Sequence, residues 1–132
     1  MIELMVVVVI VALLAAIAVP IYGKYVKSSR VSEATSRIGD IVTASKSWAM
    51  GHQNAQGEPV WPSGAGGIVD LDATANFSYA FTSGVDVNAS ARTTALGIVA
   101  TGRAGTPMAG VQVTVVVPNI TSNALAPEIT GM

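Results

Sequence analysis

The chain opens with a hydrophobic run that is too long for a strand. No charge interrupts the sequence between Glu3 and Lys24, and the run from Leu4 to Val19 is apolar throughout. The β-branched segment Val6 to Val11 alone would be typical of a buried strand, but strands usually span only ~4–8 residues. As a helix, Leu4 to Gly23 would extend ~30 Å, about the thickness of a bilayer's hydrocarbon core. The pattern therefore predicts a membrane-crossing helix.

Beyond Pro20 the spacing of the apolar positions changes, and they recur every three or four residues along one side of a helix. We expect a single helix from Ile2 to Met50, ended by Gly51, with a membrane stem over residues 1–23 and an amphipathic half over 24–50. Opposite charges on the outer face, such as Arg30 and Glu33, predict ion pairs within the helix. The stripe expected to carry the head consists of Val31, Ala34, Ile38, Ile41 and Trp48.

Residues 51–132 are predicted to form a β-rich head. Glycines and prolines indicate an irregular loop over 51–74, and residues 119–132 form a polar tail without a clear period. Strand-like segments occur at 76–81, 94–101 and 111–115, and the first and third of them alternate. The sequence thus predicts an α+β fold, in which the long N-terminal helix packs against a small antiparallel sheet of three to four strands.

Composition and charge narrow the classes of function. The chain is 51% hydrophobic but only 5% aromatic, so its apolar content lies in small and branched aliphatic side chains. Residues 51–132 carry three more acidic than basic groups, which argues against strong binding of nucleic acid by the subunit. The chain has no cysteine, which excludes a disulfide, a thiolate nucleophile and a cysteine-based zinc site.

A cleaved signal peptide is the main alternative for the hydrophobic run. Such peptides have a basic residue before a core of ~7–15 apolar residues and a small-residue cleavage site after it. Here the residue before the run is Glu3, and Pro20-Ile21-Tyr22 fits a cleavage site poorly. Tyr22 followed by Lys24 is instead typical of a membrane–water interface, so we expect the segment to be retained.

The N-terminal third resembles the first helix of bacterial type IV pilins and pseudopilins. The resemblance rests on the lone Glu3, the Ala-rich aliphatic run and a single proline at Pro20, together with the Val31-Ser32-Glu33-Ala34 segment. It implies a precursor held in the inner membrane, trimmed and N-methylated by a prepilin peptidase. Pilus assembly machinery would then pack it with its own copies into an extracellular filament on the cell surface. Relative to the family pattern, we expect two residues and a basic leader before Met1.

The resemblance also assigns roles to individual residues. A carboxylate in the membrane seeks a cation, and the family's partner for Glu3 is the N-terminal amine of a neighbouring subunit. The alternative is that Glu3 extends into the headgroups and favours its own helix N-terminus. Pro20 clashes with the carbonyl of Ala16, which predicts a kink or unwinding around 15–19, or else a simple bend. The face expected to pack against other stems is formed by Leu4, Val7, Val11, Leu14 and Ala18.

The remaining chemical signals are weak. Asn76, Asn88 and Asn119 match the N-glycosylation pattern, which arises readily in a chain rich in Ser, Thr and Asn. Asp70 and Asp72 resemble a fragment of a calcium loop without its following Gly and distal Glu, so we interpret them as a solvated acidic turn. No catalytic motif accompanies the single histidine, and we expect no enzyme activity, cofactor, metal or small-molecule substrate.

We therefore expect a structural filament subunit whose role could be adhesion, motility or DNA uptake. Two alternatives stay open: a pseudopilin of a type II secretion system, and a monomeric binding domain anchored by a single membrane span. Because pilins commonly close their C-terminal loop with a disulfide, the tail of this cysteine-free chain must be held by packing, by subunit contacts or not at all.

Overall fold

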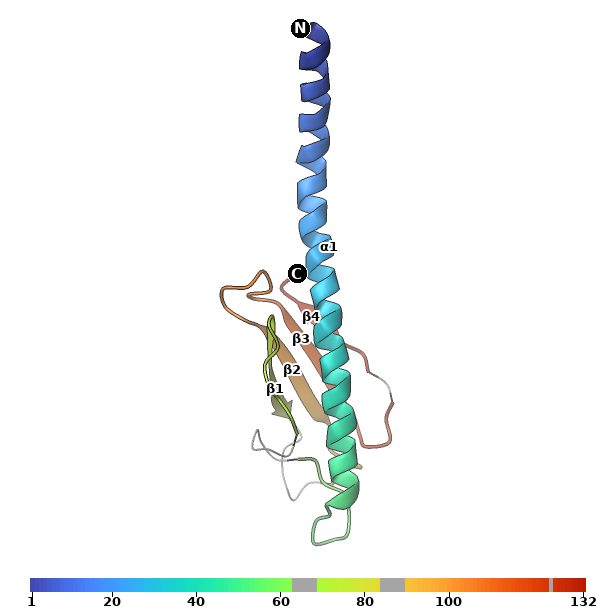
Figure 1. Ribbon diagram of the computed structural model, residues 1–132. Coiled ribbons are helices and arrows are strands. Elements are labelled where there is room, and N and C mark those ends of the chain that lie inside the picture. The colour runs from blue at the N-terminus through green and yellow to red at the C-terminus, as the bar shows by residue number, and fades with distance from the viewer. Residues whose placement is uncertain (63–68, 84–89, 124) are drawn as a thin grey trace.

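One long helix backs a four-stranded sheet, and half of that helix projects beyond it (Figure 1). The computed structural model describes residues 1–62, 69–83, 90–123 and 125–132. Its elements, in chain order, are α1 (Ile2–Gly51), β1 (Phe77–Ser83), β2 (Leu96–Gly102), β3 (Gln112–Val117) and β4 (Glu128–Thr130). The predicted α+β fold is confirmed, and α1 ends within one residue of the predicted position.

The sheet is an antiparallel meander in the order β1-β2-β3-β4. Three strands lie where the strand-like segments predicted them. The fourth corrects our prediction of a tail without regular structure, because β4 pairs with β3 through Gln112↔Thr130 and Val113↔Ile129. Three residues are too few to show alternation in the sequence. The strand forms because β3 offers an unpaired edge.

The core lies between the inner face of the sheet and the second half of α1. Val113, Val115 and Val117 alternate inward from β3, and the aromatic side chains of Phe77 and Tyr79 do so from β1. The apolar stripe of α1 contacts β2 and β3. Its buried members are Val31, Ala34, Ile38, Ile41, Val42, Ser45 and Ala49.

Trp48 is the exception to the predicted stripe. It is only half-buried, and its indole stacks on the His52 ring with centroids 3.9 Å apart and an interplanar angle of 5°. The helical period explains the error, since a step of ~3.6 residues from buried Ser45 reaches Ala49. Ala49 therefore occupies the inner position of this turn, and Trp48 lies at the edge of the stripe.

Helix α1 passes Pro20 without a break. Residues 15–19 are helical, so the unwound segment predicted there is not a feature of the isolated subunit. Pro20 has no backbone N–H to donate to the carbonyl of Ala16, so one rung of the hydrogen-bond ladder is missing. The remaining bonds keep the stem in line with the half of α1 that carries the head (Figure 1).

Gly102, the last residue of β2, allows two backbone segments to approach closely. Its N–H donates to the carbonyl of Val111 at 2.8 Å, and a Cβ at Gly102 would lie 1.7 Å from the carbonyl oxygen of Met108. The 103–110 connection can therefore fold back on β2 only if this position lacks a side chain.

We predict that Gly102→Ala lowers the free energy of unfolding by about 2–3 kcal/mol, because the backbone around Met108 must move. Gly39→Ala is the matched control: its Cβ would meet nothing within 4 Å, and alanine favours a helix over glycine by about 1 kcal/mol. Urea unfolding of the full chain in detergent, followed by tryptophan fluorescence, measures both. Equal midpoints for the two variants would contradict this account of the connection.

Candidate assembly surface

The stem, residues 1–23, is exposed along its whole length in the subunit. An 18-residue window of α1 has a mean hydropathy of 3.2, and none of it is buried, so this helix is long and apolar enough to cross a membrane. The five predicted packing residues follow steps of three and four, and the unbroken helix therefore aligns them on one side. All of them are exposed, and they are Leu4, Val7, Val11, Leu14 and Ala18.

Glu3 is an exposed carboxylate at the start of this apolar surface. It lies in the first turn of α1, where the partial positive charge of the helix N-terminus favours an acidic side chain. Within the described residues, no hydrogen bond or ion pair engages its side chain. The next charge along the helix is Lys24, ~30 Å away at 1.5 Å per residue. The stem is thus an apolar rod with a carboxylate at one end and ammonium groups at the other.

The charged side chains of Arg30 and Glu33 on α1 bind the head instead of each other. Arg30 Nη1 donates to Asn76 Oδ1 at 3.1 Å, and Asn76 Nδ2 donates to Glu33 Oε2 at 2.9 Å. All three side chains are half-buried. The predicted ion pair between Arg30 and Glu33 is therefore wrong: among the described residues, the asparagine preceding β1 bridges the two charges. Alternation and helical spacing contain no signal for such a contact.

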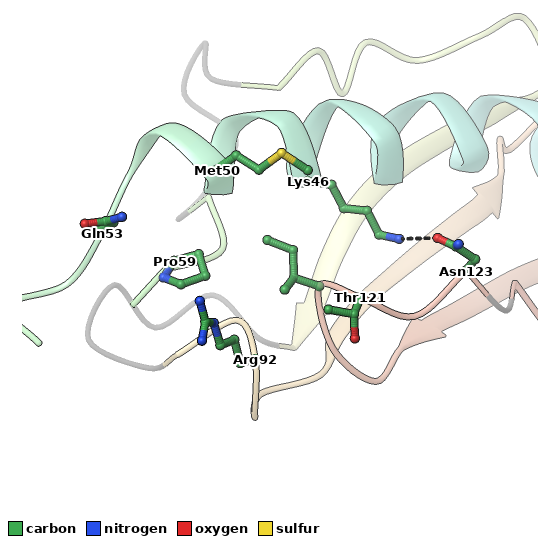
Figure 2. A pocket seen from close by; sticks show the side chains of 8 residues that line it. Lys46, Met50, Gln53, Pro59, Arg92, Thr121 and Asn123 are labelled. Atoms are coloured by element: carbon green, nitrogen blue, oxygen red, sulfur yellow. Dashed lines mark hydrogen bonds between the residues drawn. The ribbon is translucent and has the colours of Figure 1, made fainter. Parts of the chain in front are cut away.

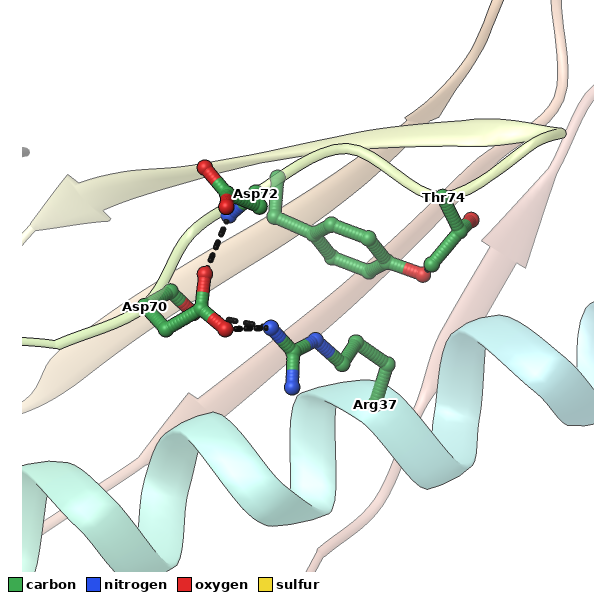
Figure 3. Close-up of polar contacts among 5 residues, drawn as sticks. Arg37, Asp70, Asp72 and Thr74 are labelled. Carbon is green, nitrogen blue, oxygen red and sulfur yellow. Dashed lines mark hydrogen bonds and ion pairs between the residues drawn. The ribbon is translucent and has the colours of Figure 1, made fainter.

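The one salt bridge among the described residues also joins helix to head (Figure 3). Arg37 Nη2 lies 2.6 Å from Asp70 Oδ2, and Asp70 Oδ1 accepts the backbone N–H of Asp72 at 2.8 Å. The hydrogen bonds from Asp72 and Arg37 lower the pKa of the Asp70 carboxyl, and the bond to Asp70 raises the pKa of Arg37. Both Asp70 oxygens are engaged by protein donors, as in an acidic turn. Within the part of the chain described, no cluster of His, Asp or Glu could hold a metal ion.

Buried Tyr79 connects the segment after this turn to the core. Its hydroxyl lies 3.4 Å from Thr74 Oγ1, and burial raises the pKa of the phenol. Thr74 also donates its N–H to the carbonyl of Phe77. The turn therefore fixes the start of β1 while Asp70 holds it against α1.

A lysine of α1 that the sequence did not indicate holds the tail against the helix. Lys46 Nζ donates to the carbonyl of Ser122 and to Asn123 Oδ1, the latter at 3.3 Å (Figure 2). Ile120 N–H donates to the carbonyl of Ala91 at 2.8 Å. Lys46, Ile120 and Asn123 are among the residues that line a groove of about 660 Å³ at the end of α1. Together with β4, they answer how a tail without cysteine is held.

The three sequence matches to a glycosylation site lie in different settings. The amide of Asn76 is occupied by the bridge between Arg30 and Glu33, and Asn88 lies outside the described residues. Asn119 Oδ1 accepts the N–H and the hydroxyl of Thr121, at 3.1 and 2.8 Å. Asn76 thus joins its segment to α1, and Asn119 makes a local turn within its own segment.

Comparisons with protein-family models, with curated proteins and with solved structures find no match to this chain.

We predict that Asn76→Ala lowers the free energy of unfolding by about 1–2 kcal/mol, because it leaves half-buried Arg30 and Glu33 without their shared partner. Thr82→Ala, in the strand that follows Asn76, is the control; Thr82 is exposed, and its replacement should cost less than about 0.5 kcal/mol. Denaturant unfolding in detergent compares them. A loss at Asn76 no larger than at Thr82 would show that the bridge does not hold the head.

The Asp70 contacts predict a dependence of stability on pH. A carboxyl whose folded pKa is lowered contributes stability that is present above its unfolded pKa and is lost as pH falls through the folded value. We expect the unfolding midpoint to fall on acidification below the ordinary range of an aspartate, and to fall less in Asp70→Asn. Titration of the Asp70 carboxyl carbon by NMR tests the cause directly; a pKa at or above that of a free aspartate would refute it.

Proposed function

We propose that this chain is a structural subunit of a type IV pilus-like extracellular filament, polymerising through its hydrophobic N-terminal helix. The observation that carries the proposal is the stem: it is apolar around its whole circumference and unpartnered, and it continues directly into the helix that backs the head. Parallel copies can pack their stems together and keep their heads outside the bundle. A protein that is only anchored in a membrane would need the apolar span, but its span would not have to continue as one straight helix into the head.

The composition of the stem supports packing between copies. Between apolar helices in lipid, association depends on close van der Waals contact, which small side chains allow. Ala12, Ala15, Ala16 and Ala18 supply such positions, and all are exposed in the subunit. The same surface would be surrounded first by lipid and later by identical stems. This explains an apolar content that the small head does not need for its own core.

Glu3 gives the proposed assembly its register. Insertion of an acidic side chain at the centre of a membrane helix costs ~2.5–3.5 kcal/mol, and an uncompensated carboxylate between apolar stems is unfavourable for the same reason. A neighbouring subunit's N-terminal amine would neutralise it at one axial position only. Stems docked at other heights would leave both charges unpaired, so the ion pair selects a single stagger.

In this proposal the subunit first resides in the inner membrane, anchored by residues 1–23. A prepilin peptidase trims and methylates the N-terminus, and the pilus assembly machinery transfers the subunit to the filament outside the cell. The resemblance of residues 1–34 to type IV pilins supports these steps, as does the finding that α1 could span a membrane. In the described structure, the first helix residue with a hydrogen bond to the head is Arg30, and the buried stripe begins at Val31.

Substitution of Glu3 tests the proposal. We predict that Glu3→Gln and Glu3→Ala leave the amount of subunit in the membrane fraction unchanged but reduce sheared filaments at least tenfold. The control is Glu128→Gln, which removes an exposed carboxylate from β4 and should preserve filament yield. Immunoblots of membrane and sheared fractions, with electron microscopy at native expression, measure both quantities.

Both alternatives predict a result different from that of the proposal. A monomeric membrane-anchored binding domain would give no fibres from any variant. A pseudopilin would give no long surface fibres at native expression. Normal filament yield from both Glu3 variants would refute charge pairing as the basis of assembly.

A further inference from the structure

The edge of the head nearest the stem forms a cleft with α1. The 103–110 connection and the C-terminal residues approach the helix where the stem ends (Figure 1). The cleft has a volume of about 510 Å³; Tyr22, Lys24 and Lys27 line it from the helix, and Pro107 and Met132 line it from the head. It is the place where the head and the apolar rod come together.

This cleft lies at a defined height relative to the apolar run. Val19 ends the uninterrupted run, and Lys24 is the first cation after it, ~7 Å further along the helix axis at 1.5 Å per residue. When the stem spans a bilayer, these positions lie at the level of the lipid headgroups. The edge of the head beside them must lie at the same level. Exposed Met132 and Pro107 then face the membrane surface instead of bulk water.

The chemistry of the cleft matches an anionic phospholipid. Lys24 and Lys27 are one helical turn apart, both line the cleft, and neither has a hydrogen bond or ion pair among the described residues. The rest of its lining is mainly apolar. Paired ammonium groups suit a phosphodiester, and the apolar wall suits the glycerol and the first carbons of the acyl chains. A soluble anion would bind the ammonium groups but would have no use for the apolar wall.

We infer that this cleft binds the phosphate headgroup of an anionic phospholipid and thereby seats the head on the membrane surface before assembly. The inference rests on the membrane-anchored state within the proposed function, but not on filament formation. Each lysine near an anionic surface strengthens binding by about fivefold. The lipid therefore favours the anchored subunit, and it must be released when the stem leaves the bilayer.

A single fluorescent label tests the inference in the full chain. Because the sequence has no cysteine, Ala109→Cys places one label on the exposed 103–110 connection, and Ala55→Cys places one on the exposed far end of the head. Subunits are reconstituted singly in nanodiscs of phosphatidylcholine, or of an equimolar mixture with phosphatidylglycerol. Quenching by a lipid with a spin-labelled headgroup then reports contact with the membrane surface.

We expect stronger quenching at position 109 in the mixed discs than in phosphatidylcholine alone, and little quenching at position 55 in either. Replacing both lysines by alanine, Lys24→Ala with Lys27→Ala, should weaken the phosphatidylglycerol-dependent binding that the quenching reports by about 25-fold, a factor of about five for each lysine. The double change to arginine should preserve it, as should Arg92→Ala, which removes a cation from the opposite end of the head.

Three results would overturn the inference. Equal quenching in the two disc types would exclude recognition of the anionic headgroup. Tight binding of soluble glycerol phosphate by the detergent-solubilised subunit would assign the cleft to a free anion. Quenching that appears only at high subunit-to-disc ratios would assign it to a second copy. Glu3→Gln should leave the signal unchanged, so failure of assembly and failure of lipid binding are distinguishable.

Discussion

The packing of one stripe of α1 on the inner face of the sheet is the contact on which the rest of the molecule depends. That stripe, from Val31 to Ala49, supplies one wall of the head's core, while the other end of the same helix is exposed along its whole length. Because the helix does not break between the two halves, burial of the stripe fixes the direction of the stem. The hydrophobic effect in the head thus determines how an apolar surface outside it is presented.

A cysteine-free head of this size needs other means of closing its periphery. Polar contacts between segments far apart in the sequence provide them: Asn76 and Asp70 hold the approach to β1 on α1, and Lys46 holds the segment before β4. Trp61, which is fully buried, donates from its indole nitrogen to the carbonyl of Thr94 at 2.8 Å. Each contact lies at the border of the apolar core, where a solvent-exposed loop would otherwise separate from it.

The sequence predicted the features that follow from local periodicity. A long apolar run and a stripe at helical spacing were sufficient for α1, and three strand-like segments, one of them strictly alternating, located β1, β2 and β3 to within a few residues. What it did not predict depends on partners distant in the chain. Strand β4 exists because of the edge of β3, and Arg30 binds Asn76 although Glu33 is closer in sequence. The proposed role of Glu3 depends on a contact between two subunits, which the periodicity of one chain does not encode.

The missing rung at Pro20 has a mechanical consequence. A tensile load applied to the head passes through the stripe of α1 and then along a single backbone to the stem. Resistance to stretching in a helix comes from its ladder of hydrogen bonds, and the carbonyl of Ala16 has no such bond to lose. Each residue that changes from helical to extended backbone lengthens the chain by ~1.8 Å. The helix therefore has a defined place at which to yield under force, and the head and its core need not deform.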